Sequence, residues 1–107
     1  MRKTGKIISF TPYEAVLNAE GQAVMGRDGL AVMKRTVVVD CSYTNEDGYD
    51  IRDAYVCDMY KEVKDEDLQR WKDSSEKVAF YITCDINKSD DGRYFQKVKL
   101  TNIRALQ

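Results

Sequence analysis

A run of alternating apolar residues near the end of the sequence limits the fold more than any other feature. From position 78 to position 86 every second residue is apolar: Val78, Phe80, Ile82, Cys84 and Ile86. This period of two indicates a β-strand with one buried face. Turn-forming residues follow at 87–92, where Gly92 is available for a positive φ. Because Arg93–Ala105 is again rich in aromatic and β-branched residues, the sequence predicts that Lys77–Gln107 is a β-hairpin.

Three further strands are predicted before this hairpin. The first spans Thr4–Tyr13 and offers Ile7, Ile8 and Phe10 to the core; Pro12 marks its end or an edge. The second spans Met33–Tyr43, with one face expected to be buried. That face carries Val37, Val39, Cys41 and Tyr43.

The third predicted strand spans Tyr49–Tyr60, where a bulge is one explanation for the less regular alternation. Between the first and second strands, residues 18–33 contain two glycine turns. We expect this stretch to be a long loop or a small hairpin that protrudes from the domain.

A change of period after the third strand predicts one short helix. Acidic residues at 65–67 suit the free N–H groups and the dipole of a helix start. Leu68 and Trp71 share a face, and Glu66 and Arg70 are spaced to form an ion pair. So short a helix needs Leu68 and Trp71 packed against a sheet.

The predicted order is three strands, one short helix and two strands. This is the element order of the OB fold, a five-stranded Greek-key barrel, here with its helix between strands 3 and 4. We therefore expect an all-β, OB-fold-like domain that covers residues 1–107. An SH3-like barrel and an open α+β sheet are the alternatives.

Composition bounds the function. Seventeen basic residues nearly balance eighteen acidic ones, whereas proteins that neutralise phosphates usually carry a basic excess. The sequence has no histidine and no CxxC motif, so we expect neither a metal nor another cofactor. Cys41, Cys57 and Cys84 are expected to be small buried hydrophobes, and free thiols favour a reducing compartment.

No catalytic or membrane motif is evident. A cysteine nucleophile normally needs a base such as histidine, and the paired carboxylates at 66–67 and 90–91 lie at a helix start and in a turn. We therefore expect a binding protein and not an enzyme. With neither a signal peptide nor a transmembrane stretch recognised, a cytoplasmic protein without membrane contact is the simplest expectation.

Strand alternation predicts a candidate binding surface. If Tyr94, Val98 and Leu100 point inward, then Phe95, Lys97 and Lys99 point outward, and Tyr81 points outward from the preceding strand. Exposed aromatic rings beside lysines suit single-stranded nucleic acid, whose bases stack on rings and whose phosphates meet ammonium groups. The other candidates are Arg35, Lys88 and Arg93 for a basic stripe, and Tyr55 or Tyr60 for another ring. The alternative is a solvated lysine face with tyrosines on a half-buried barrel surface.

The C-terminal part of the chain resembles a known group of proteins. The strand KVAFYITCDIN, a polar turn and GRYFQKVKLTNI, preceded by the helix DEDLQRW, are similar to small bacterial OB-fold proteins of the single-stranded-DNA-binding type. The resemblance implies binding of single-stranded DNA or RNA through the second, third and fifth strands and their flanking loops. The alternative is a protein-interaction or assembly module on the same fold, with a protein partner or a homo-oligomer and with the 18–33 loop serving that contact.

Overall fold

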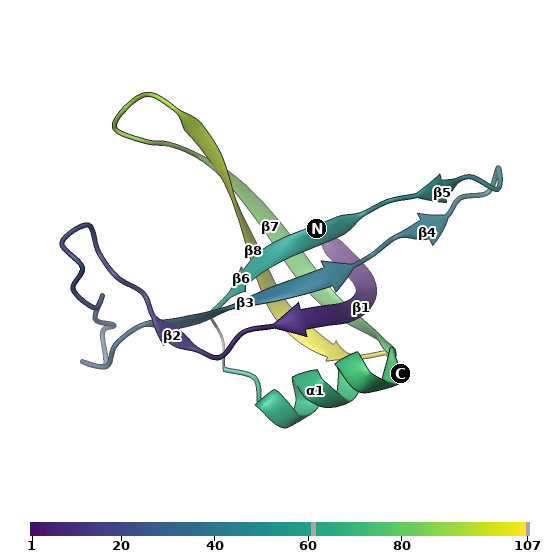
Figure 1. Ribbon diagram of the computed structural model, residues 1–107, viewed down its shortest axis with the longest axis horizontal. Coiled ribbons are helices and arrows are strands. Elements are labelled where there is room, and N and C mark those ends of the chain that lie inside the picture. The colour runs from purple at the N-terminus through teal and green to yellow at the C-terminus, as the bar shows by residue number, and fades with distance from the viewer. Residues whose placement is uncertain (61, 107) are drawn as a thin grey trace.

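The computed structural model describes residues 1–60 and 62–106 of the chain. Five long strands and one helix make up the body of the molecule (Figure 1): β1 (Arg2–Phe10), β3 (Met33–Asp40), β6 (Ala54–Met59), α1 (Asp65–Ser74), β7 (Lys77–Lys88) and β8 (Tyr94–Ala105). Three short strands lie in the connections: β2 (Glu14–Ala15), β4 (Tyr43–Thr44) and β5 (Asp50–Ile51).

The five long strands close into a barrel. Their order is β1-β7-β8-β6-β3, and β1 also pairs with β3, which joins the two ends of the sheet. Neighbouring strands are antiparallel except for β6 and β8, which are parallel. The predicted all-β, OB-like barrel with one short helix between its third and fourth strands is confirmed.

β1 contributes to the barrel on both of its edges. Residues 2–6 pair with β7 and residues 6–10 pair with β3, with a register irregularity between Ile7 and Ser9. This irregularity lets both Ile7 and Phe10 face the core, whereas Ile8 is 48% exposed. The prediction for Ile8 was therefore wrong, because simple alternation does not reveal a bulge.

The core fills the barrel and extends beneath α1. Its members are Ile7, Val37, Val39, Cys41, Cys57, Met59, Leu68, Trp71, Val78, Phe80, Ile82 and Leu100. Leu68 and Trp71 hold the helix on the barrel, as predicted. The expected Glu66–Arg70 pair is replaced by a bond of 3.1 Å between Arg70 Nη1 and Asp67 Oδ1. The helix begins after Lys64 without a side-chain cap.

The β7–β8 hairpin extends beyond the barrel (Figure 1). β1 pairs with β7 only as far as Tyr81, and β6 pairs with β8 only at Lys99. Nothing in these two strands therefore covers the far part of the hairpin, where Ile86 is 74% and Tyr94 is 71% exposed. Cys84 is exposed too, so the prediction that these three side chains are buried was wrong.

Two other ribbons project from the barrel. Residues 16–32 form a folded ribbon that starts from the β2–β3 pair and is held by bridges at Leu17–Ala23 and Met25–Ala31. The second ribbon is the β4–β5 hairpin. It interrupts the predicted second and third strands, because β3 ends at Asp40; Tyr43 is consequently 55% exposed and not in the core.

Among the described residues, α1 is a short amphipathic helix, and none of the helical structure is long and apolar enough to cross a membrane.

The closure point at Gly5 gives a stability prediction. A Cβ atom at this position would lie 2.6 Å from the Asp40 carbonyl oxygen and 2.9 Å from Cys41 Sγ. We expect Gly5→Ala to lower the free energy of unfolding by about 1–3 kcal/mol in urea denaturation, since overpacking forces backbone to move. Thr4→Ala, on the adjacent exposed position, should change it by less than about 0.5 kcal/mol. Equal unfolding midpoints for the two variants would contradict this account of closure.

Candidate nucleic-acid interface

The residues predicted to form one surface lie in several different places. Phe95, Lys97 and Lys99 come together on β8, whereas Arg35 is buried. Tyr55 and Tyr81 each pack beside a basic residue from β1. Lys88 and Arg93 lie at the far end of the β7–β8 hairpin.

Arg35 lies in the barrel interior and is only 1% exposed. Its guanidinium lies 4.1 Å from the ring centroid of Tyr13 and 5.3 Å from that of Phe10, and it donates a short hydrogen bond to Asp65 at the start of α1. Arg35 therefore does not join a surface stripe. The signal was in the sequence, because Arg35 has the same alternation phase as the buried Val37.

Tyr55 faces inward from β6 and packs against the core. Lys3 Nζ lies 5.7 Å from its ring centroid and 2.7 Å from Asp53 Oδ2. The bond to Lys3 lowers the pKa of Asp53, and the same bond raises the pKa of Lys3. Tyr55 is thus part of a local ion-pair cluster and is not the ring that accompanies Phe95.

The ring that accompanies the β8 lysines is Tyr60, which follows β6. Lys97 Nζ lies 5.6 Å and Lys99 Nζ 5.5 Å from the centroid of this ring. The parallel pairing of Asp58 with Lys99 places the two strands side by side. We call this surface the β6–β8 face; it consists of Val56, Asp58, Tyr60, Phe95, Lys97 and Lys99.

The β6–β8 face combines apolar and cationic groups around a shallow hollow. Val56, Asp58 and Phe95 line this hollow together with residues 96–98. Phe95 is 51% exposed, so one side of its ring is open to solvent. A flat apolar ring beside an open hollow is suited to stacking against another planar group.

The two lysines of this face are available to an anion. Within the described part of the chain, neither Lys97 nor Lys99 forms an ion pair with a carboxylate. The Tyr60 hydroxyl raises the pKa of Lys97, and the charges of Asp58 and Asp85 act in the same direction. Lys97 therefore remains a cation at neutral pH, and the ammonium groups of both lysines lie over the Tyr60 ring.

Lys88 and Arg93 lie beyond this face. Lys88 pairs with Tyr94 across the hairpin, and its Nζ is 5.9 Å from the Tyr94 ring centroid. Since Tyr94 is one position from Phe95, its side chain leaves the opposite side of the strand. Arg93 is highly exposed, with its Nε 3.4 Å from Asp91 Oδ2 in the hairpin turn.

The three cysteines do not form a metal site. Burial raises the pKa of Cys41 to about 11 and that of Cys57 to about 12, whereas Cys84 is exposed. In residues 1–60 and 62–106, no three His, Cys, Asp or Glu side chains are grouped so that they could hold a metal ion.

Comparisons with protein-family models and with curated protein sequences gave no match for this chain. The class of the protein, a closed OB-like β-barrel, is therefore defined by its strand order and pairing.

The buried Arg35 gives a second stability prediction. Asp65→Ala leaves an unpaired guanidinium in the barrel, which we expect to lower the free energy of unfolding by about 1–2 kcal/mol; a fully buried pair would lose more, but Asp65 is largely exposed. Glu66→Ala removes an acid from the same helical turn and should cost less than about 0.5 kcal/mol.

The double variant Arg35→Met/Asp65→Ala is the internal control for this prediction. Because it removes the buried charge as well as its partner, it should be more stable than Asp65→Ala alone. Chemical denaturation of the unmodified protein and these three variants measures the differences, and equal losses for Asp65→Ala and Glu66→Ala would show that the ion pair contributes nothing.

Proposed function

We propose that this protein binds single-stranded nucleic acid through the β6–β8 face. The observation that carries the proposal is the half-exposed Phe95 ring beside two lysines gathered over Tyr60. Bases stack on exposed aromatic rings irrespective of their identity, and phosphates pair with ammonium groups along a groove. Phe95 is the stacking platform, and Lys97 and Lys99 meet the backbone phosphates.

The arrangement of the connections supports the same proposal. The ribbon of residues 16–32 joins the first and second barrel strands, and the hairpin end joins the fourth and fifth. In OB folds the loops at these two places flank the oligonucleotide-binding surface of strands 2 and 3, and the β6–β8 face contains the third of these strands, β6. The ribbon of residues 16–32 and the end of the β7–β8 hairpin both extend toward the left in the view of Figure 1.

The free energy of base stacking indicates how strongly such a site would depend on phosphate contacts. Stacking contributes about 1–3 kcal/mol for each base, whereas a micromolar dissociation constant corresponds to about 8 kcal/mol. Stacking on one or two rings is not enough, so phosphate contacts must supply a large share of the affinity. Binding should then weaken as salt rises, with little preference for sequence.

A second candidate is a protein-interaction or assembly module. It is favoured by the exposed apolar side chains Ile86 and Tyr94, which lie on the same side of the β7–β8 hairpin and are 74% and 71% exposed. Exposed apolar side chains that lie together often mark protein interfaces. A homodimer that buries these side chains, seen as a doubled mass in light scattering and lost in Ile86→Ser, would support this candidate.

The nucleic-acid proposal predicts a selective effect of Phe95→Ala. In a fluorescence-anisotropy titration with a labelled mixed-sequence strand, DNA or RNA, we expect micromolar binding at low salt that Phe95→Ala weakens about tenfold, the equivalent of about 1.4 kcal/mol of stacking. Lys97→Gln should lower the dependence of log K on log salt by about 0.7, the loss of one phosphate contact.

Tyr94→Ala is the matched control, because Tyr94 is the neighbouring aromatic residue on the other side of the same strand. It should leave the affinity within about twofold of the unmodified protein, a smaller change than the loss of a ring that stacks with a base. An equal loss in both variants, or no binding at low salt, would contradict the proposal.

A further inference from the structure

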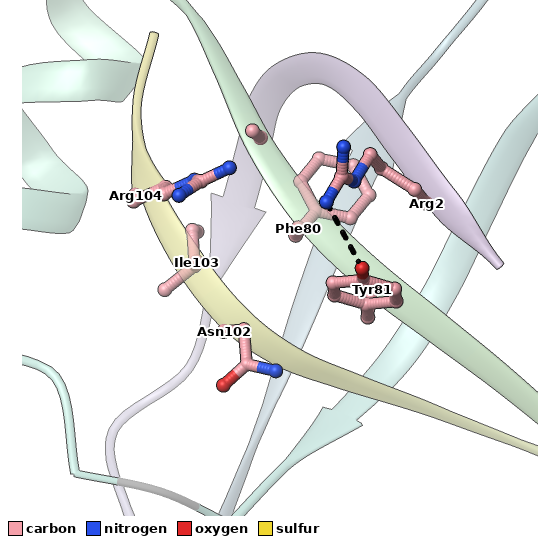
Figure 2. Close-up of a pocket in the computed structure, with 7 residues that line it drawn as sticks. Arg2, Phe80, Tyr81, Asn102, Ile103 and Arg104 are labelled. Carbon is pink, nitrogen blue, oxygen red and sulfur yellow. Dashed lines mark hydrogen bonds between the residues drawn. The ribbon is translucent and has the colours of Figure 1, made fainter.

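A second hollow opens on the outer face of β1, β7 and β8 (Figure 2). Its lining comes from all three strands: Arg2, Ala79, Phe80, Tyr81, Asn102, Ile103 and Arg104. None of these lining residues is acidic. Apart from Tyr81, no residue of this hollow belongs to the surface predicted from the sequence.

Two arginines converge on this hollow. Figure 2 shows Arg2 reaching from β1 and Arg104 reaching from β8, toward β7 from opposite sides. Arg2 Nη2 donates a hydrogen bond of 3.1 Å to the Tyr81 hydroxyl, and its guanidinium lies 5.5 Å from the Tyr81 ring centroid. Among the described residues, no carboxylate forms an ion pair with either arginine. An anion between them would relieve their mutual repulsion.

An irregularity in β8 places Arg104 at this hollow. Asn102 has a φ of 55°, in the left-handed region, where the pairing of β7 with β8 shifts between Ala79 and Tyr81. Strict alternation from the buried Leu100 would turn Arg104 inward. The extra residue instead turns Ile103 toward the core and leaves Arg104 opposite Ala79 on the outer face. Bulges re-aim side chains in this way and are common beside functional sites.

The hollow continues the surface of the proposed binding site. Phe95, Lys97, Lys99 and Thr101 occupy alternate positions on one side of β8, and Thr101 pairs with Tyr81. At a rise of about 3.3 Å per residue, Thr101 lies about 20 Å along the strand from Phe95. One side of the hairpin therefore leads from the stacking ring of the β6–β8 face to the ring of Tyr81.

We propose that this hollow is a second nucleotide subsite, which holds a phosphate and a base of the same single strand. The proposal rests on the function proposed above. Arg2 and Arg104 hold the phosphate, the exposed side of Tyr81 stacks with the base, and the Asn102 amide donates or accepts a hydrogen bond at its edge. A bound strand then follows β8 from Phe95 to Tyr81.

The length of the nucleic acid gives the test. OB folds bind about 4–16 nucleotides, so labelled oligonucleotides of about 4 and about 12 nucleotides represent a single subsite and the full path. In Arg2→Gln/Arg104→Gln, the affinity advantage of the longer strand over the shorter one should fall at least about fivefold. The salt dependence for the longer strand should fall by about 1.4, for two lost phosphate contacts.

Two further variants keep the result interpretable. Arg104→Gln alone leaves the Arg2–Tyr81 bond in place and should show about half of the change in salt dependence, about 0.7. Arg70→Gln removes the same charge from the exposed side of α1 and should leave the length advantage unchanged. Thermal unfolding of each variant confirms that it is folded.

The outcomes separate this proposal from the one on which it rests. An unchanged length advantage in the double variant, together with a loss in Phe95→Ala, would overturn the second subsite and leave the β6–β8 face standing. No binding of either strand would overturn both. If adenosine monophosphate saturably shifts the amide resonances of Tyr81 and Asn102 while the longer strand does not, the hollow takes a free nucleotide, and the continuous path is wrong.

Discussion

The pairing of β1 on both of its edges is the interaction on which the rest of the barrel depends. Lys6 is the residue at which β1 passes from one partner to the other, since it lies opposite Lys77 of β7 and opposite Asp40 of β3. The close approach of β1 to Asp40 is possible because Gly5 has no side chain. Closure of the barrel in turn brings β8 beside β6. Because these two strands are neighbours, Lys97 and Lys99 lie over the Tyr60 ring.

A buried cation fixes the helix relative to the barrel. Arg35 joins three segments that are distant in sequence, because it stacks on Tyr13 after β1, extends from β3 and bonds Asp65 at the start of α1. The Tyr13 hydroxyl also accepts a hydrogen bond of 2.9 Å from the Val63 amide. Burying a charge is costly, and the Arg35 guanidinium offsets this cost through two aromatic rings and one carboxylate, although its Nε and Nη1 atoms have no hydrogen-bond partner among the described residues.

The barrel could be predicted from the sequence because its strands and helix have clear periods. Alternation identified the buried side of β7 and brought Phe95, Lys97 and Lys99 together on one surface. The alternation of residues along a strand shows which side of the strand a side chain lies on. It does not show whether another element covers that side, so Ile86 and Tyr94 were wrongly predicted to be buried. It also does not reveal bulges, which is why Arg104 was overlooked and Ile8 misassigned. Arg35 was misplaced for a different reason: arginine is seldom buried, although this one shares the alternation phase of the buried Val37.

Two of the three cysteine thiols are buried and one is exposed, so the protein has one natural site for a thiol-reactive label. At neutral pH, Cys41 and Cys57 remain protonated and enclosed, because the barrel interior raises their pKa values to about 11 and about 12. The thiolate is the nucleophile in alkylation, so these two are slow to react. Cys84 is exposed on β7, opposite Val98. A maleimide dye added to the folded protein would therefore attach at Cys84 without any engineered residue, and its emission would report on the overhanging end of the β7–β8 hairpin.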